Sequence, residues 1–230
     1  MGRRVKIEII TMFPEFFDSV FSQSIIRRAQ EAEKVSLIIH DLREYSGGPY
    51  HHLDDYRFGG GAGMLMKPEP FFRVFEKIFE AEGKTPLVIF PTPQGIPFEQ
   101  SIADDLAKED HMVMICGHYK GIDQRVIDRW VDREYSIGDY VVSGGEVASA
   151  VISDAVIRLI PGVLGNLDSA RTDSFSSGML DGPHYTRPVN YKNYKVPDVL
   201  INGHHKNIQR WRKMTSTVLT KRRRADLISN

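Results

Sequence analysis

The sequence has little cysteine, no long apolar run and no net excess of charge of either sign. Its single cysteine, Cys116, excludes an internal disulfide and leaves too few thiols for a zinc ribbon. No stretch approaches the ~20 consecutive apolar residues of a membrane span. The first residues carry charge but no apolar region with a cleavage site, so no secretory signal is expected. With 230 residues, 41% of them hydrophobic, these absences predict a cytoplasmic globular protein of one or two domains.

Common nucleotide and metal motifs are also missing. The first apolar run leads into TMFPEFF, which has none of the glycines of a dinucleotide fingerprint. The GKT tripeptide at 83–85 lacks the P-loop glycine five residues earlier, where Ile78 stands. Two histidine pairs, at 51–52 and 204–205, are adjacent in sequence and have no acidic partner at ligand spacing, so no metal site is expected.

What the chain does contain is an alternation of short β-rich runs with longer helical patterns. Apolar runs predict strands at residues 5–11, 35–40, 86–91 and 111–116. Helical spacing separates them at 14–30, 68–82 and 98–108, and a long buried helix is predicted at 145–160, before Pro161–Gly162. The alternation predicts an α/β fold with a parallel sheet covered by helices.

Charge is unevenly distributed along this chain. From Met179 to Asn230, 11 Lys and Arg oppose 3 Asp and Glu, whereas the remainder has 19 basic and 27 acidic residues. The turn-rich segment 162–178 predicts a flexible linker between a first domain, 1–161, and a second, 179–230, in which β-runs cease and basic helices are expected. The basic tail either binds a polyanion or presents a solvated helical face, and charge alone leaves both open.

Three glycine-bearing loops follow apolar or strand-like runs: Thr92–Gly95 (TPQG), Gly117–Gly121 (GHYKG) and Ser136–Glu146 (SIGDYVVSGGE). Ligands of α/β sheets collect at the carboxyl ends of the strands. Glycine lets backbone approach a ligand closely and adopt positive φ. The three loops therefore either converge on a pocket lined by backbone groups or are three ordinary tight turns.

Motifs along nearly the whole chain resemble those of the bacterial tRNA (guanine-N1)-methyltransferases of the SPOUT class. They include TMFPEFF, LDDYRFGGGAGMLMKP, TPQG, CGHYKGIDQRV, YSIGDYVVSGGE, RLIPGVLG, TDSF, LDGPHYTRP, VPDVLINGHH and IQRWR. The resemblance implies a SPOUT-type parallel sheet with a deep C-terminal trefoil knot, an exception to the rule that chains avoid knots, and a small helical C-terminal domain. It also implies a homodimer with the helix of residues 145–160 across the interface, although a core helix would have the same composition.

The resemblance further implies methyl transfer from S-adenosylmethionine to N1 of the guanosine at position 37 of tRNA, 3′ of the anticodon. Asp173, in the TDSF motif, would be the general base that removes the N1 proton. Arg158 would stabilise the negative charge that develops on O6. Taken alone, Asp173 could equally be a turn or N-cap residue, and Arg158 a structural ion-pair partner.

Other site residues carry over from the family by position. The expected cofactor-binding residues belong to the three glycine-bearing loops: Thr92, Pro93, Gln94, Gly117, Ser136, Ile137, Gly138, Asp139, Tyr140, Val141, Val142, Gly144 and Gly145. Asp54 matches a position around the target guanine. Basic residues of the second domain are expected to hold the anticodon arm, and we assign this role to Lys206, Arg210, Arg212 and Lys213. Trp211 is expected in the core rather than as a stacking platform for a base. The active site is expected to be shared between subunits.

Two positions depart from the family pattern. Lys120 stands where many members carry a glutamate that could pair with the ammonium group of the cofactor, and Ala148 stands where many carry proline. Two other functions fit the same fold. A methyltransferase acting on a ribose 2′-hydroxyl would have no N1 proton to remove, so the TDSF motif argues against it. A non-catalytic RNA-binding protein would not need Asp173 and Arg158 together with all three loops.

Overall fold

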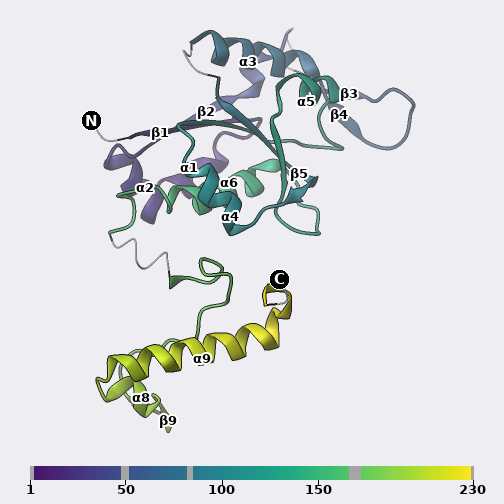
Figure 1. The fold of residues 1–230 in the computed structure, drawn as a ribbon. Coiled ribbons are helices and arrows are strands. Elements are labelled where there is room, and N and C mark those ends of the chain that lie inside the picture. The colour runs from purple at the N-terminus through teal and green to yellow at the C-terminus, as the bar shows by residue number, and fades with distance from the viewer. Residues whose placement is uncertain (1–2, 48–51, 82–84, 166–171, 229–230) are drawn as a thin grey trace. The chain divides into compact units, whose positions relative to one another are not determined.

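The computed structural model describes residues 3–47, 52–81, 85–165 and 172–228, which form two compact units, 1–165 and 166–230 (Figure 1). A five-stranded parallel sheet forms the centre of the N-terminal unit, in the order β2-β1-β6-β5-β7. Its strands are β1 (Val5–Thr11), β2 (Val35–Asp41), β5 (Leu87–Pro97), β6 (His111–Ile115) and β7 (Arg133–Ser136). The predicted α/β fold with a parallel sheet is confirmed, while β7 has no counterpart among the predicted strand ranges.

Helices cover both faces of the sheet (Figure 1). On one face lie α1 (Phe16–Phe21), α2 (Ser24–Glu31), α4 (Gln100–Leu106) and α6 (Gly145–Ile157); on the other lie α3 (Pro68–Ala81) and α5 (Gln124–Trp130), with the 3₁₀ turn η1 (Leu42–Tyr45). Side chains of β1 point to both faces of the sheet. Ile7 and Ile9 pack in the cluster that contains α6, and Ile10 packs in the cluster that contains α3. The core therefore consists of two apolar layers separated by the sheet.

The single helix predicted over 14–30 is in fact two helices, α1 and α2. The polar residues between them offer no apolar side chain to continue the buried stripe, and Ser24 has a left-handed φ of 49°. The side-chain amide of Gln30 donates to the carbonyl of Phe21 at 2.9 Å, which satisfies one backbone acceptor that the break leaves open.

Two short hairpins complete the fold. In the N-terminal unit β3 (Asp54–Tyr56) pairs antiparallel with β4 (Met64–Met66) across the glycine-rich segment 57–63. The C-terminal unit contains β8 (Asn190–Tyr191), β9 (Tyr194–Lys195), α8 (Asp198–Ile201), α9 (His205–Arg223) and the 3₁₀ turn η2 (Ala225–Leu227). The expectation that β structure ends before Met179 is therefore wrong, because Lys192 and Asn193 take positive φ and close a tight β8–β9 turn.

The predicted linker is described only in part. Residues 166–171 of the predicted linker lie outside the described residues, and so do both glycine and lysine of the GKT tripeptide. The division into units after Gly165 falls within the range 162–178. The predicted trefoil knot stays a prediction. Within the described residues, none of the helices combines the length and apolar character that crossing a bilayer requires.

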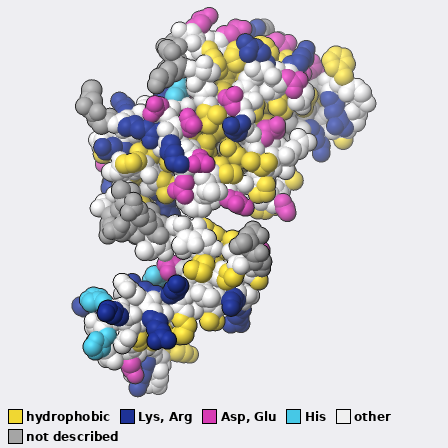
Figure 2. Space-filling view, viewed as in Figure 1, with side chains coloured by type: hydrophobic (Ala, Val, Ile, Leu, Met, Phe, Trp, Pro, Cys, Tyr) yellow, Lys and Arg dark blue, Asp and Glu magenta, His cyan; other side chains and the backbone are white. Residues whose placement is uncertain are grey.

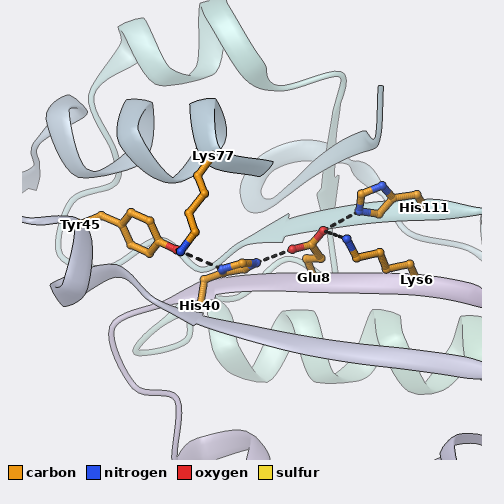
Figure 3. Close-up of polar contacts among 6 residues, drawn as sticks. All are labelled: Lys6, Glu8, His40, Tyr45, Lys77 and His111. Atoms are coloured by element: carbon orange, nitrogen blue, oxygen red, sulfur yellow. Dashed lines mark hydrogen bonds and ion pairs between the residues drawn. The ribbon is translucent and has the colours of Figure 1, made fainter. Parts of the chain in front are cut away.

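A buried carboxylate lies in the middle of the sheet. Glu8 of β1 is 3% exposed and contacts His40 of β2, His111 of β6 at 2.8 Å and the ammonium group of Lys6 at 2.7 Å. Burial would raise the pKa of Glu8, but the hydrogen bonds from His111, His40 and Lys6 outweigh it and hold the pKa well below its ordinary value. Figure 3 shows how this Glu8 cluster continues outward through the Tyr45 hydroxyl, 3.4 Å from His40 Nδ1, to Lys77.

Candidate active site

The three glycine-bearing segments belong to neighbouring strands of the sheet. Residues 117–121 follow β6 and residues 136–144 follow β7, and both strands flank β5. Thr92–Gly95 is not a loop after a strand, as predicted, but an irregularity inside β5, where the register against β7 shifts between Pro91 and Ile96. The segment lies inside the strand because β5 continues to pair with Tyr135 and Ser136 beyond the bulge. The segments therefore lie at the carboxyl side of three adjacent strands.

Close backbone packing explains two of the glycines. A Cβ on Gly95 would lie 2.4 Å from the backbone nitrogen of Tyr135, and a Cβ on Gly145 would lie 2.6 Å from Cys116 Cα. The amide of Gly145 donates to the carbonyl of Gly117 at 2.9 Å, which ties the start of α6 to the loop after β6. The reason is contact rather than positive φ, because neither Gly95 nor Gly145 has a φ in the left-handed region.

Glu146, the second residue of α6, is the centre of a buried hydrogen-bond network. Its carboxylate accepts from Thr11 Oγ1 at 2.6 Å and from His118 Nε2 at 2.7 Å. An ionised carboxylate only accepts, so the proton lies on Nε2 of His118. Burial would raise the pKa of Glu146, but the hydrogen bonds from His118 and Thr11 prevail and lower it. The helix N-terminus also favours a negative charge at this position.

This network joins the ends of β1 and β6 to the first turn of α6. Thr11, His118 and Glu146 are not among the predicted site residues, although an acidic residue directly after a glycine pair at a helix start is a visible signal. The partners themselves are far apart in the chain and become neighbours only in the folded sheet. The network holds the Gly117–Gly121 loop and the start of α6 in a fixed relation.

The β3–β4 hairpin packs against the Gly117–Gly121 loop. The amide of Lys120 donates to the carbonyl of Met64 at 3.1 Å, and the amide of Met66 donates to the carbonyl of Gly121 at 3.0 Å. Burial and the neighbouring carboxylate of Asp54 raise the pKa of Tyr119. The structure therefore brings Asp54 beside the predicted cofactor loop.

Lys120, one of the two departures from the family pattern, lies against the glycine-rich segment. A Cβ on Gly63, which has φ of 89°, would meet Lys120 Cγ at 2.7 Å. Ala148, the other departure, is buried in α6 on the face that packs toward the sheet.

Arg158 and Asp173 lie in different units. Arg158 is half-buried at the C-terminal end of α6, and its amide donates to the carbonyl of Asp154 at 3.3 Å. Asp173 is half-buried in a turn of the C-terminal unit, where its carbonyl accepts from the amide of Ser176 at 3.3 Å. The sequence-predicted roles of the two side chains stay predictions.

The predicted cofactor residues of the last loop begin at the end of β7. Ser136 is buried and its hydroxyl donates to the carbonyl of Gly138 at 3.1 Å, while Tyr140 and Val141 are exposed. In the C-terminal unit the predicted tRNA-binding residues are exposed along α9: Lys206, Arg210, Arg212 and Lys213. Figure 2 shows Lys and Arg side chains on the visible face of this unit. Trp211 is only partly buried, so the expectation of a core residue holds in part.

No group of three His, Cys, Asp or Glu side chains among the described residues is placed to hold a metal ion. The arrangement at the carboxyl side of β5, β6 and β7 instead offers backbone N–H and C=O groups, and a small ligand that forms hydrogen bonds with both fits such a surface.

Known proteins are similar to this chain over nearly its whole length. Residues 5–230 match the family described as tRNA (Guanine-1)-methyltransferase TrmD. A tRNA (guanine-N(1)-)-methyltransferase of Listeria monocytogenes serotype 4a is 48% identical over 227 residues, which cover 98% of this chain and 93% of that protein. One from Bacillus cereus strain AH820 is 48% identical over 224 residues, 97% of this chain and 92% of its own. The chain therefore belongs to the tRNA (guanine-1)-methyltransferase family, as the resemblance of its motifs implies.

Proposed function

We propose that this protein methylates N1 of the guanosine at position 37 of tRNA, with S-adenosylmethionine as the methyl donor. One structural observation supports this proposal most directly. The Gly145–Gly117 hydrogen bond joins two glycine-bearing segments at the carboxyl side of adjacent strands, next to the bulge at Thr92–Gly95. Family membership supports guanine N1 as the atom modified.

The residues present fit the proposed cofactor. The segment from Ser136 to Val142 presents the exposed side chains of Tyr140 and Val141, and an aromatic ring beside an aliphatic group suits a planar, uncharged adenine base. The residues that would hold it are Thr92, Pro93, Gln94, Gly117, Ser136, Ile137, Gly138, Asp139, Tyr140, Val141, Val142, Gly144 and Gly145. When bound, S-adenosylmethionine supplies an electrophilic methyl group on a sulfonium. Lys120 is positively charged, so it cannot form an ion pair with the ammonium group of S-adenosylmethionine.

The protein side of the reaction is proton removal and charge stabilisation. Guanine N1 carries a proton at neutral pH, so its nitrogen is a poor nucleophile until a base takes that proton. Asp173 accepts the N1 proton in our proposal. Removal of the proton places negative charge on O6, and the guanidinium of Arg158 stabilises that charge. Asp54, whose carboxylate neighbours Tyr119 of the Gly117–Gly121 loop, would contact the guanine in this proposal.

We propose further that two copies form a dimer with shared active sites. Val147 and Val151 lie one helical turn apart on α6 and are 43% and 47% exposed, an apolar pair that a second subunit would cover. The knot region of one subunit would hold the cofactor while Asp173 comes from the other.

Mass mapping of tRNA after incubation with a labelled cofactor tests the reaction. A methyl group on any atom other than N1 of guanosine 37 contradicts the proposal. The Asp173→Asn variant keeps the side-chain shape but removes the base, so we expect kcat to fall by about 10²–10⁴-fold, while the cofactor Kd measured by calorimetry stays unchanged.

A mixed dimer tests the shared site. Asp173→Asn and Gly145→Val subunits are co-expressed with different tags, and the heterodimer is isolated. In a shared arrangement one of the two sites combines an intact cofactor region with an intact Asp173, so activity returns toward half that of the wild type. Two self-contained subunits would each carry a lesion, and a folded but inactive heterodimer would reject the shared site.

A further inference from the structure

A cavity of about 440 Å³ lies within the C-terminal unit and is lined only by residues of that unit. Segment 183–189 forms one side of it, and α8 and α9 contribute Leu200, Ile208, Trp211 and Arg212. Its volume falls within the range of about 300–1,000 Å³ that small-ligand sites occupy in proteins. We call it the C-terminal cavity.

The C-terminal cavity combines aromatic and aliphatic surfaces. The rings of Tyr185 and Trp211 both line it, with centroids 6.3 Å apart and planes inclined at 52°. The rings are tilted and do not stack on each other, so neither ring covers the face of the other. Tyr185 is 50% exposed, and Leu200 and Ile208 supply aliphatic contact. This is a surface for a planar, largely apolar ring.

The same cavity is positively charged. Arg187 and Arg212 line it, and within the described residues no hydrogen bond or ion pair engages either guanidinium. By contrast, Arg224 of the same unit pairs with Asp226 at 2.7 Å. No acidic side chain of the described residues lines the cavity. Two guanidiniums beside an aromatic surface are complementary to a ligand that joins a flat ring to an anion.

We infer that the C-terminal cavity binds one unpaired nucleotide of the RNA substrate. The base stacks on Tyr185 or Trp211, and Arg187 and Arg212 contact the adjacent phosphate. Single-stranded RNA is recognised by aromatic stacking combined with arginine, whereas a continuous duplex keeps its bases inside the helix. The inference rests on the proposed function for the identity of the RNA, and it adds a base contact to the phosphate contacts of α9.

Tryptophan fluorescence gives a direct test because the chain has only two tryptophans. Trp130 packs in the core of the N-terminal unit, stacked on Phe75 at 5.1 Å, so Trp130→Phe leaves Trp211 as the only indole. The full chain is titrated with tRNA, and binding is followed in parallel by filter retention. A stacked base is expected to quench the emission of Trp211 in step with binding. Should Trp130→Phe fold poorly, the difference between wild-type and Trp211→Phe emission reports the same event.

Substitutions locate the effect. Tyr185→Ala and Arg187→Ala are each expected to weaken tRNA binding by about 10-fold, within the range measured for loss of a stacked base. Tyr194→Ala is the matched control, since Tyr194 is 82% exposed on β9 and does not line the cavity. A loss for Tyr194→Ala as large as that for Tyr185→Ala overturns the assignment, and so does wild-type affinity in Arg187→Ala.

Two further titrations show which kind of RNA changes the fluorescence of Trp211. A single-stranded oligonucleotide with the anticodon-loop sequence is expected to quench Trp211, and a blunt RNA duplex is not. Equal quenching by the duplex, or saturated tRNA binding with unchanged Trp211 emission, rejects the cavity as a nucleotide site. Failure of the proposed function has a different signature, because the tRNA would then carry no methyl group on guanine N1.

Discussion

Gly145→Ala tests the close approach of α6 to the end of β6. The added Cβ would lie 2.6 Å from Cys116 Cα and 2.7 Å from the nitrogen of Gly117, whereas carbon atoms in contact are normally about 3.5–4.0 Å apart. Both neighbours are backbone atoms, so no side chain can swing aside. Overpacking of this kind costs about 1–3 kcal/mol, and we expect the upper end here. The helix propensity of alanine offsets up to about 1 kcal/mol, which leaves a loss of about 2 kcal/mol.

The assay is thermal unfolding together with calorimetry of S-adenosylmethionine binding. A loss of about 2 kcal/mol corresponds to a fall in Tm of roughly 4–8 °C for a chain of this size. The matched control is Gly165→Ala, because a Cβ there meets nothing within 4 Å. We expect Gly165→Ala to keep the wild-type Tm and cofactor affinity, and Gly145→Ala to lose both. Equal values for the two variants would refute the reasoning.

Three further predictions concern buried polar groups. The pKa of Glu8 is lowered in the folded state, so its carboxylate stabilises the fold above the ordinary pKa of 4.5 and loses that effect as the pH falls below 4.5. In Glu8→Gln the unfolding free energy should therefore vary less with pH below 4.5, and an unchanged slope would contradict this. Glu146→Gln removes the charge that orders His118 and Thr11, so we expect it to raise KM for S-adenosylmethionine more than it lowers kcat; a variant with wild-type cofactor affinity would argue against a positioning role. Burial and the nearby Glu146 carboxylate raise the pKa of Cys116, so iodoacetamide should label this thiol only after unfolding, and rapid labelling of the native protein would show that the interior opens.

Features that depend on local sequence were predictable, and features that depend on pairing were not. The four predicted strands carry apolar runs, so local composition reveals them even in β2, where only Val35 is fully buried. Arg133–Ser136 has only two buried residues at its end, and it becomes a strand because β5 offers it a pairing edge. The same pairing turns Thr92–Gly95 into a bulge within β5, an outcome that no short window of the sequence contains.

The candidate site shows the same division. The three segments could be recognised by their glycines, because two backbone segments can approach this closely only where no side chain stands between them. The Glu146 network could not be predicted in the same way. Thr11 and Glu146 are 135 positions apart in the chain, and they meet only after β1 and β6 have paired and α6 has docked on them.

The Glu8 cluster also bears on how the chain selects one strand alignment. Glu8 pairs in register with Ile38 of β2 and Val113 of β6, and the histidines that contact its carboxylate come one from each neighbouring strand. A slip of β2 by one residue would move His40 to the opposite face of the sheet, and a slip of β6 would do the same to His111. Either error would leave a less compensated carboxylate in a buried position, which is strongly unfavourable. We therefore expect Glu8 to disfavour misaligned sheets during folding. The surrounding Ile and Val side chains are similar to one another and would tolerate such a misalignment.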